Sequence, residues 1–403
     1  MPSVFEAIKV ADFSWIGVGP MIAKYLADHG ATVVHVESIT SPDVLRLAPP
    51  YKDGIAGIDR SGYFATYNNN KYGLSLNLNH PAGREVARRL IAWSDIVVES
   101  FTPGTMKRWG LDYEELMKAR PDIIMISTCN QGQSGPHATH PGFGTQLVSL
   151  AGVTHLTGWP DRPPAQPYAA YTDIVAPRFG LAGLIAALDY RDRTGKGQYL
   201  DLSQQEAAIN LLAPLALDYI VNGREAERMG NRCPYAAPHG AYPCRGEDEW
   251  CVIAVFSDEE WQSFCRIMGN PEWSRDPRFA TVAARVENSA ELDRLVEAWT
   301  KRHTAEEVMT LLQEGGVAAG MVHTAEGVHN DPQLAARDHF GKLEHREIRR
   351  YHCDGPAFKL SKTPAQMNMP APCLGEHNEY VLKEILGLSE EEFVELLLGG
   401  AVE

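Results

Sequence analysis

Short runs rich in valine and isoleucine alternate with amphipathic segments through the first half of the chain. Five runs (IKVADF, ATVVHVE, SDIVVES, IIMISTC and QYLDLS) predict strands at residues 8–13, 31–37, 94–100, 123–129 and 198–203. Helical spacing of apolar residues predicts helices at residues 20–30, 83–93, 111–119 and 178–191, and one long apolar helix at 204–221. This alternation is typical of a parallel sheet covered on both faces, so we expect an open α/β fold.

The composition changes near Asn222. Residues 222–243 are rich in glycine, proline and arginine, which is typical of a linker or loop. Residues 250–323 contain two strand-like runs and several charged helical segments. We therefore expect a large domain over residues 1–222, followed by a linker and a smaller α+β domain over residues 223–335.

The overall composition narrows the class of protein. The chain has 403 residues, 44% of them hydrophobic and 22% charged, which suits a globular protein with a large core. Its net charge of −15 argues against a nucleic-acid partner. No apolar run approaches the roughly 20 residues of a membrane span, and the N-terminus does not resemble a secretory signal. Seven scattered cysteines without a C-x-x-C pair predict reduced thiols in a cytoplasmic protein, without a zinc site.

The first predicted turn resembles a dinucleotide-binding fingerprint. Gly17, Gly19 and Ala23 follow a strand and open a helix, and Glu37 ends the next strand, where such proteins place an acid for the ribose. Ile22, however, occupies the third glycine position, where the helix must approach the strand closely. A tight turn into a helix is therefore favoured over a nicotinamide cofactor.

Two further motifs carry charged groups that suit chemistry. Asp173 lies between a loop rich in proline and tyrosine and an apolar helix. From the residues alone, a helix N-cap is the favoured interpretation, and a partly desolvated nucleophilic carboxylate at a helix start is the alternative. Lys107 and Arg108 follow a strand end and a turn, where a phosphate site and a solvated basic pair are equally supported.

Six segments together are similar to the family III CoA-transferases, which include the formyl-CoA:oxalate, carnitine and benzylsuccinate CoA-transferases. No single segment is decisive, but their order and spacing are specific and span nearly the whole chain. They are DFSWIGVGPMIAKYLADHGATVVHVE, NNNKYGLSLNLNHPAGREV, VVESFTPGTMKRWGLDYEEL, PYAAYTDI, RTGKGQYLDLS and LGEHNEYVLKEILGLS.

The resemblance implies a fold and an assembly. It implies a Rossmann-like open parallel sheet in a large domain built from both chain ends, with residues 336–403 returning to it. It also implies an interlocked homodimer, or a heteromer with a related subunit. The substrates would be an acyl-CoA and a carboxylic acid, with no permanently bound cofactor and no metal.

The resemblance also implies site residues. Asp173 matches the nucleophile that forms aspartyl mixed-anhydride and aspartyl-CoA thioester intermediates, which reverses the preference for a cap. Residues matching family contacts to CoA are Gly17, Val18, Leu76, Asn77, Leu78, Asn79, Ser100, Phe101, Thr102, Arg108, His140, Pro141, Gly142 and Phe143. Tyr168, Tyr171 and Phe143 are candidates for the walls of a pocket that must exclude water.

The sequence departs from its relatives at several positions. Ser38 and Pro141 stand where some relatives have cationic contacts to CoA phosphates. The segment CPYAAPHG, at residues 233–240, stands where some relatives have a glycine-rich lid. In racemases of the same fold, the alternative function, a histidine lies where this chain has Phe143, which cannot carry a proton; His140 lies three positions earlier.

The resemblance leaves the acids open. The segment 152–171 is rich in tryptophan, tyrosine and proline, which suits a bulky or aromatic acceptor. We therefore expect succinyl-CoA as donor and benzylsuccinate or another bulky acid as acceptor.

Overall fold

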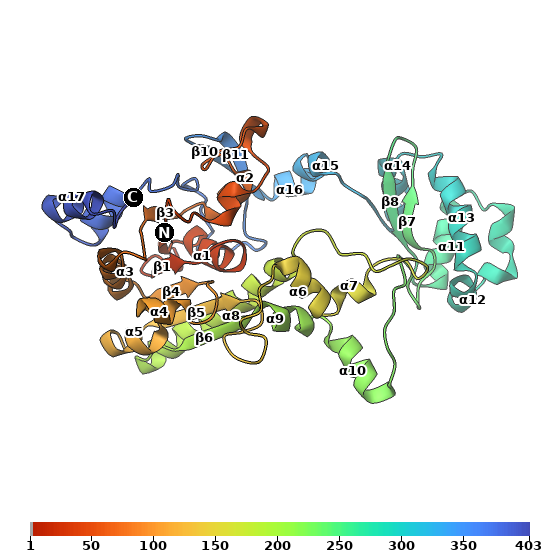
Figure 1. Cartoon of the computed structure of the whole chain (residues 1–403). Helices are drawn as coiled ribbons and strands as arrows, with labels where there is room; N and C mark the ends of the chain where they lie inside the picture. Colours follow the sequence, from red (N-terminus) through yellow and green to blue (C-terminus); the bar gives the residue numbers. More distant parts are fainter. Residues whose placement is uncertain (1–2) are drawn as a thin grey trace. The chain divides into compact units, whose positions relative to one another are not determined.

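The structure is a computed structural model that describes residues 3–403 (Figure 1). The chain forms two compact units. Unit 1 contains residues 1–154, 166–225 and 335–403, so both chain ends contribute to it. Unit 2 contains residues 155–165 and 226–334. Residues 155–165, which the sequence places in the large domain, therefore cluster with unit 2.

Unit 1 is built on a six-stranded sheet in which every strand pair is parallel. The strand order is β3-β2-β1-β4-β5-β6. The strands are β1 (Lys9–Phe13), β2 (Thr32–Glu37), β3 (Tyr72–Ser75), β4 (Ile96–Glu99), β5 (Ile124–Cys129) and β6 (Tyr199–Ser203). The predicted α/β fold and its five strands are confirmed. The edge strand β3 was missed, because its glycine and the asparagines around it indicate a loop.

Alternate residues of the strands enter two separate hydrophobic cores, one on each face of the sheet. Val10 packs with helices α1 (Val18–Asp28) and α8 (Tyr171–Thr194), whereas its neighbour Ala11 packs with α3 (Pro81–Trp93). Side chains in a strand point alternately to opposite faces, so both faces must be covered. For this reason the strands are continuous apolar runs in the sequence and do not alternate between apolar and polar residues.

Helix α8 is the longest helix of unit 1. Within residues 3–403 it is the one helix whose length and apolar composition would suit a membrane span. Ala176, Leu184 and Ala187 on it are fully buried, in the core shared with α1. Packing in this core therefore explains the apolar composition of α8. It ends, as the predicted glycine turn indicates, at Gly195, which adopts a left-handed conformation with φ of 71°.

The predicted long helix at residues 204–221 is wrong. The structure has two helices there, α9 (Gln204–Asn210) and α10 (Ala213–Asn222). Pro214 lies in the first turn of α10, where its missing N–H costs nothing, but it could not continue a helix from α9. The apolar pattern runs through the break, so hydrophobic periodicity alone did not reveal it.

Smaller elements complete unit 1. The C-terminal residues pack on the β3 edge, since Leu76 forms a β-bridge with Val402 and Asn77 N–H bonds to the Ala401 carbonyl. The predicted acidic helix is α17 (Glu390–Leu398), and residues Tyr380–Ile385 form a π-helix. The remaining elements are α2 (Gly62–Asn68), α4 (Thr105–Trp109), α5 (Tyr113–Ala119), α6 (Gly144–Leu150), α7 (Val153–Leu156), α16 (Pro332–Ala336), the hairpin β10 (Phe340–His345) and β11 (Arg349–Asp354), and 3-10 turns at Val44–Leu47 and Lys52–Gly54.

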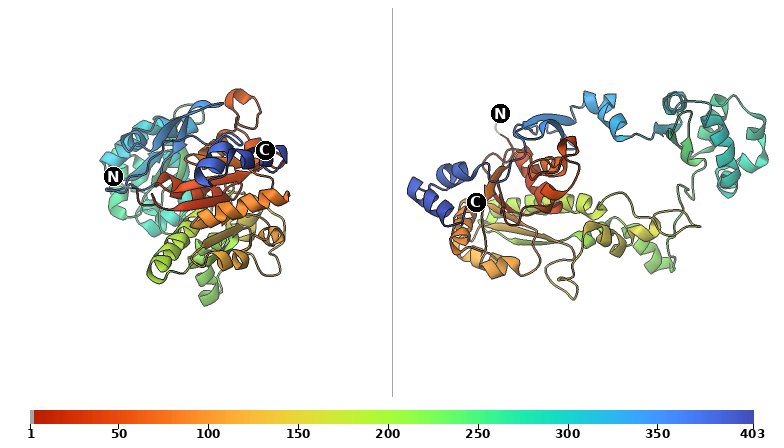
Figure 2. Two further views of the ribbon diagram at one scale, coloured as in Figure 1. Left: turned by 90° about the vertical axis from the view of Figure 1, so that its left-hand side faces the viewer. Right: turned by 45° about the horizontal axis from the view of Figure 1, so that its top comes forward.

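Unit 2 is an antiparallel sheet packed against helices, as expected for the smaller α+β domain (Figure 2). Its strands are β7 (His239–Pro243), β8 (Trp250–Ala254) and β9 (Ala318–Met321). Trp261, Phe264 and Val296 lie in one core with strand residues such as Ile253. Its helices are α11 (Asp258–Ile267), α12 (Val282–Glu287), α13 (Ser289–Thr300), α14 (Ala305–Glu314) and α15 (Ala325–His329), with 3-10 turns at Glu272–Arg275 and Pro277–Phe279.

A network of buried charges lies at the carboxyl-end side of β1 and β2. Asp12 accepts hydrogen bonds from Lys71 Nζ (2.8 Å) and His35 Nδ1 (3.0 Å). Glu37 accepts a bidentate pair from Arg46, with Nη2–Oε2 of 2.6 Å and Nε–Oε1 of 2.8 Å. Burial opposes ionisation of Asp12 and Glu37, but the charges of Lys71 and Arg46 outweigh it and hold the pKa of both carboxyls below their usual range.

Replacing Arg46 by methionine tests the network. Arg46→Met should lower the free energy of unfolding by about 3–5 kcal/mol, because it leaves the Glu37 carboxylate buried without its cation. Urea denaturation measures the change. The matched control is Arg193→Met, which removes an exposed i,i+4 pair with Asp189 and should cost no more than about 0.5 kcal/mol. Equal, small losses in both variants would contradict the assignment.

Candidate active site

A cavity of about 280 Å³ opens in unit 1 at the carboxyl ends of β1, β4 and β5. Ligands of open α/β sheets bind at this edge. The structure brings ten of the predicted site residues together around it: Gly17, Val18, Ser100, Phe101, Thr102, His140, Pro141, Gly142, Phe143 and Asp173. The lining also includes residues that were not predicted, namely Trp15, Ile16, Pro103, Thr128, Cys129, Asn130, Ala138, Gly144 and Gln204.

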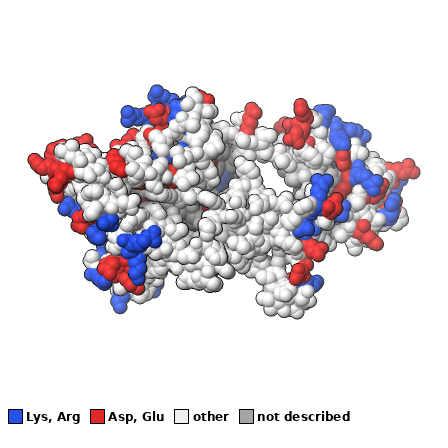
Figure 3. Space-filling view, viewed as in Figure 1, with Lys and Arg blue, Asp and Glu red and all other residues white. Residues whose placement is uncertain are grey.

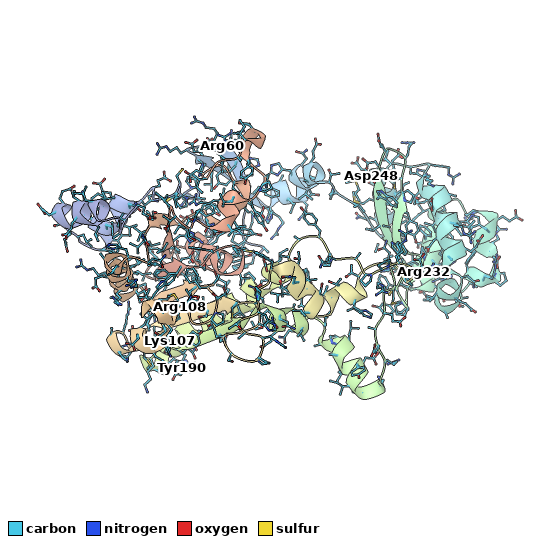
Figure 4. All side chains as sticks on the ribbon, viewed as in Figure 1. Arg60, Lys107, Arg108, Tyr190, Arg232 and Asp248 are labelled. Atoms are coloured by element: carbon cyan, nitrogen blue, oxygen red, sulfur yellow. The ribbon has the colours of Figure 1, made fainter. Side chains whose placement is uncertain are left out.

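Five predicted contacts lie outside this lining. Leu76 and Leu78 are buried in the core with α3, and Asn77 bonds to the C-terminal segment. Asn79 follows them at the end of the edge strand, where its N–H bonds to the Asn77 side chain. Arg108 is exposed on α4 and donates to Thr105 Oγ1 at 2.8 Å (Figure 4).

Asp173 is the third residue of α8, whose N-cap is Ala170. The interpretation of Asp173 as the N-cap is therefore wrong, because the helix begins earlier than the sequence indicates. Its Oδ1 accepts a hydrogen bond from Thr172 Oγ1 at 3.2 Å. Burial raises the pKa of Asp173 to about 6, and the bond from Thr172 opposes this only in part.

Two glycines flank the Asp173 carboxylate. A Cβ atom on Gly144 would lie 2.5 Å from Asp173 Oδ1 and 2.4 Å from Ala170 Cβ. A Cβ atom on Gly17 would lie 3.2 Å from Asp173 Oδ2. Any larger residue at Gly144 would displace the carboxylate, so the first turn of α8 and the start of α6 can approach only through a glycine.

Hydrogen bonds to three other segments of the chain fix the loop that carries Gly17. The Ile16 N–H donates to both oxygens of Asp43 at 3.1 Å, and Ile16 adopts a left-handed conformation with φ of 68°. The Trp15 N–H donates to Ser100 Oγ at 2.8 Å, and the Trp15 indole N–H donates to the Val36 carbonyl at 3.1 Å. A β-branched residue with positive φ is strained, so these bonds hold a conformation that isoleucine would otherwise leave.

The loop that carries residues 140–143 is fixed in the same way. Asn130 Nδ2 donates to the Gly142 carbonyl at 3.0 Å, and the Phe143 N–H donates to Gln146 Oε1 at 2.9 Å. His137 and His140 lie with their rings 4.5 Å apart. The lining of the cavity is thus held by side-chain bonds to backbone groups, which sequence patterns do not reveal.

Glu99, at the end of β4, is a buried acid behind the lining that the sequence analysis missed. Its Oε2 accepts the Phe101 N–H at 2.7 Å, and its Oε1 accepts from Gln133 Nε2 at 3.3 Å. Burial raises the pKa of Glu99 to about 7, with a further rise from the charge of Asp201. An acid ending a buried strand, as in VVES, is the signal that could have identified it.

The expected aromatic walls are only partly confirmed. Phe143 lines the cavity and is 65% exposed. Tyr168 is 99% exposed, and Tyr171 packs against the core beneath α1 and α8. The aromatic segment 152–171 does not line this cavity, so it supports no bulky acceptor there.

The residues of the first turn do not suit a dinucleotide. Glu37 is buried and both its oxygens bond to Arg46, so its carboxylate cannot serve a ribose. Gly19 is needed for packing, since a Cβ atom there would lie 2.2 Å from Ser14 Cβ. Within residues 3–403, no group of three histidine, cysteine or acidic side chains has an arrangement that could hold a metal.

Comparison with known proteins decides the family. The sequence pattern of CoA-transferase family III matches residues 5–378. The chain belongs to CoA-transferase family III. The resemblance noted in the sequence is thereby confirmed, as is the transferase class.

Relatives of this family III enzyme match it over nearly its full length. It is 34% identical to a succinyl-CoA–D-citramalate CoA-transferase of Chloroflexus aurantiacus, covering 98% of this chain and 97% of that protein. It is 29% identical to a succinyl-CoA:glutarate CoA-transferase of Mus musculus, and the match covers 99% of this chain and 90% of that protein. A solved CaiB/BaiF family protein from Brucella suis superposes with a TM-score of 0.87 at 31% identity, covering 96% and 100%.

Adding a methyl group at Gly144 tests the geometry around Asp173. Gly144→Ala should reduce CoA transfer at least tenfold, because the new Cβ atom must push the carboxylate from its position. The rate of transfer measures this, with circular dichroism to confirm folding. Gly62→Ala is the matched control, since its Cβ atom would meet nothing closer than 3.5 Å. A Gly144→Ala enzyme as active as the control would contradict the role of this contact.

Proposed function

We propose that this family III enzyme transfers CoA through Asp173 as its nucleophile. The observation that carries the proposal is the position of the carboxylate, in the cavity at the strand ends and between Gly17 and Gly144. With a pKa of about 6 the group is mostly ionised at neutral pH, yet more basic than an ordinary aspartate. A more basic carboxylate is a better nucleophile.

The reaction proceeds in four steps. The Asp173 carboxylate attacks the thioester carbonyl of the donor, the C–S bond breaks, and CoA leaves as a thiolate from a mixed anhydride. The thiolate attacks the aspartyl carbonyl and releases the donor acid, which leaves an aspartyl-CoA thioester. The acceptor carboxylate attacks that thioester, forming a second anhydride and freeing CoA thiolate. The thiolate then attacks the acceptor carbonyl, which yields the new acyl-CoA and restores Asp173.

The proposed donor is succinyl-CoA and the proposed acceptor is a small dicarboxylic acid. Both relatives described above are named for succinyl-CoA and for a dicarboxylate, citramalate or glutarate. Benzylsuccinate, the acceptor expected from the sequence, has no support from these relatives, and the aromatic segment behind that expectation lies outside the cavity.

The proposed CoA site follows the cavity lining. Gly17, Val18, residues 100–102 and residues 140–143 would contact the thioester end of the cofactor. Arg108 lies six residues after Thr102, on the exposed α4, and is proposed for a phosphate of CoA. No role in the CoA site is supported for residues 76–79, since the leucines are in the core and the asparagines bond to neighbouring backbone.

The pH dependence of transfer tests the nucleophile. The reacting form is the carboxylate, so kcat/KM should fall about tenfold per pH unit below an apparent pKa near 6. Asp173→Asn should abolish transfer at every pH while still binding acyl-CoA. A pH profile of the wild type between pH 4.5 and 8 measures the first effect. A limb at or below pH 4, or an active Asp173→Asn enzyme, would contradict the proposal.

The stability of Asp173→Asn supplies a control. Because the folded state raises the pKa of Asp173, folding favours the protonated form; that contribution is present below pH 3.8 and is lost as the pH rises through about 6. At pH 8 the Asp173→Asn protein should therefore be at least as stable as the wild type, in which Asp173 is ionised.

Hydroxylamine added with the donor should convert wild-type Asp173 to a hydroxamate, which peptide mapping detects.

A dimer of interlocked chains is proposed for the assembly. Helix α10 has no buried residue, and Leu217, Ile220 and Val221 are 60%, 76% and 68% exposed. Figure 3 shows a largely uncharged stretch over this helix and over α8 and α9. Apolar surface of this extent is typical of a protein–protein interface, and its burial by a second copy would be favourable.

Dilution tests the interlocked assembly. Light scattering over a hundredfold dilution should show a dimer throughout, because linked chains separate only by unfolding. A monomer that keeps its native circular dichroism would contradict the interlock.

Activity of the chain purified alone distinguishes a homodimer from a heteromer.

A further inference from the structure

A second cavity, of about 320 Å³, lies in unit 1. It lies between α1, α2, α8 and the end of β11, and its lining includes Met21, Tyr67, Ile174, Arg178 and Asp354. Ile174 directly follows Asp173, and Met21 lies one helical turn after Gly17. Asp173 thus lines the first cavity, and the next residue of α8, Ile174, lines the second.

Arg178 brings a positive charge into this second cavity. Its guanidinium donates to the carbonyl oxygen of Ile174 on its own helix, so the side chain folds back along α8 by about one turn. None of the ion pairs in residues 3–403 includes Arg178. The other cation of the lining, Lys24, is already engaged, because it bonds to Asp28 at 2.5 Å and to the Asp354 carbonyl at 3.1 Å. Arg178 is thus the available anion-binding group.

Tyr67 provides a neutral donor from the facing helix α2. It is partly buried and its ring packs edge-on against Tyr63, with 5.1 Å between ring centroids. Burial, Tyr63 and the negative charges of Asp173 and Asp354 all raise the pKa of its hydroxyl, so it remains a donor at neutral pH.

The acidic residue of the lining, Asp354, limits where an anion can bind. It lies at the end of β11, is exposed, and forms no ion pair with Arg178. Repulsion by Asp354 disfavours an anion at its end of the cavity, whereas attraction favours the Arg178 end, beside Ile174. The cavity therefore suits a carboxylate at its Arg178 end, beside Ile174.

We propose that Arg178, with Tyr67, binds the distal carboxylate of a dicarboxylic acyl group whose thioester carbonyl is attacked by Asp173; this rests on the function proposed above. The two carboxyl carbons of a succinyl group are joined through three C–C bonds of ~1.5 Å each and so lie about 4 Å apart. The Arg178 Cα lies five residues beyond Asp173, about 7.5 Å along the helix and about 140° around it, and its guanidinium folds back to the Ile174 carbonyl. An acyl group that reaches from the Asp173 side of α8 past Ile174 would bring its distal carboxylate to this guanidinium, and a bidentate pair would fix its orientation.

A comparison of two donors tests the assignment. Butyryl-CoA has the same chain length as succinyl-CoA but lacks the distal carboxylate. The ratio of kcat/KM for succinyl-CoA to that for butyryl-CoA, at a fixed acceptor, should fall about 10- to 100-fold in Arg178→Met, the range for losing a charge-assisted hydrogen bond. Arg178→Lys should retain part of the preference, and Tyr67→Phe should lose a smaller part.

Control variants separate the possible outcomes. Arg193→Met removes an exposed arginine further along α8 and should leave the ratio at its wild-type value. An unchanged ratio in both Arg178→Met and Tyr67→Phe would overturn the proposal, as would equal losses for both donors. The Kd values of the two thioesters for Asp173→Asn give the same ratio without chemistry. If succinyl-CoA binds more tightly than butyryl-CoA but the wild type transfers no CoA, the proposed function is refuted and the carboxylate site is supported. If the wild type transfers CoA from both donors equally well, the proposed function is supported and the carboxylate site is refuted.

Discussion

The buried charge network around β1 and β2 fixes the loop on which the site is built. Glu37 accepts the Asp43 N–H as well as the Arg46 guanidinium, and Asp43 in turn accepts the Ile16 N–H. Buried ion pairs are seldom more stable than well-packed apolar residues, so stability alone does not account for them. Here they hold Ile16 in a strained left-handed conformation, and this places Gly17 against the Asp173 carboxylate.

The same close packing sets the basicity of Asp173. Gly17 and Gly144 let backbone approach the carboxylate from both sides, which removes water and raises its pKa to about 6. An anion buried in this way reduces stability at neutral pH, because folding favours its protonated form. This loss of stability comes from a group that the proposed reaction needs as an ionised and relatively basic carboxylate. Such a conflict between stability and function is common at active sites.

The sequence allowed the strands to be predicted more fully than the site. Strands with valine and isoleucine on both faces were identified, whereas β3 was missed because Gly73 and its neighbouring asparagines resemble a loop. The predicted cavity residues came from the resemblance to the family and not from the residue pattern, and the N-cap prediction for Asp173, which did come from the pattern, failed because α8 begins two residues before it. The role of Glu99 depends on Phe101 and Gln133, which only the folded chain brings to it.

Helix α8 connects the fold with the proposed chemistry, because Asp173 lines the cavity at the strand ends and Ile174 lines the second cavity. The cavity at the strand ends is lined largely by backbone and small residues, which suits a cofactor common to every substrate of the enzyme. The cavity beyond Ile174 is lined by Tyr67, Arg178 and Asp354, which suits discrimination among acids. A nucleophile that must receive CoA and then pass it to a different acid needs the thioester end fixed while the acyl end is exchanged. Because α8 carries both Asp173 and Arg178, one helix holds the attacking carboxylate and the group proposed to bind the departing acid.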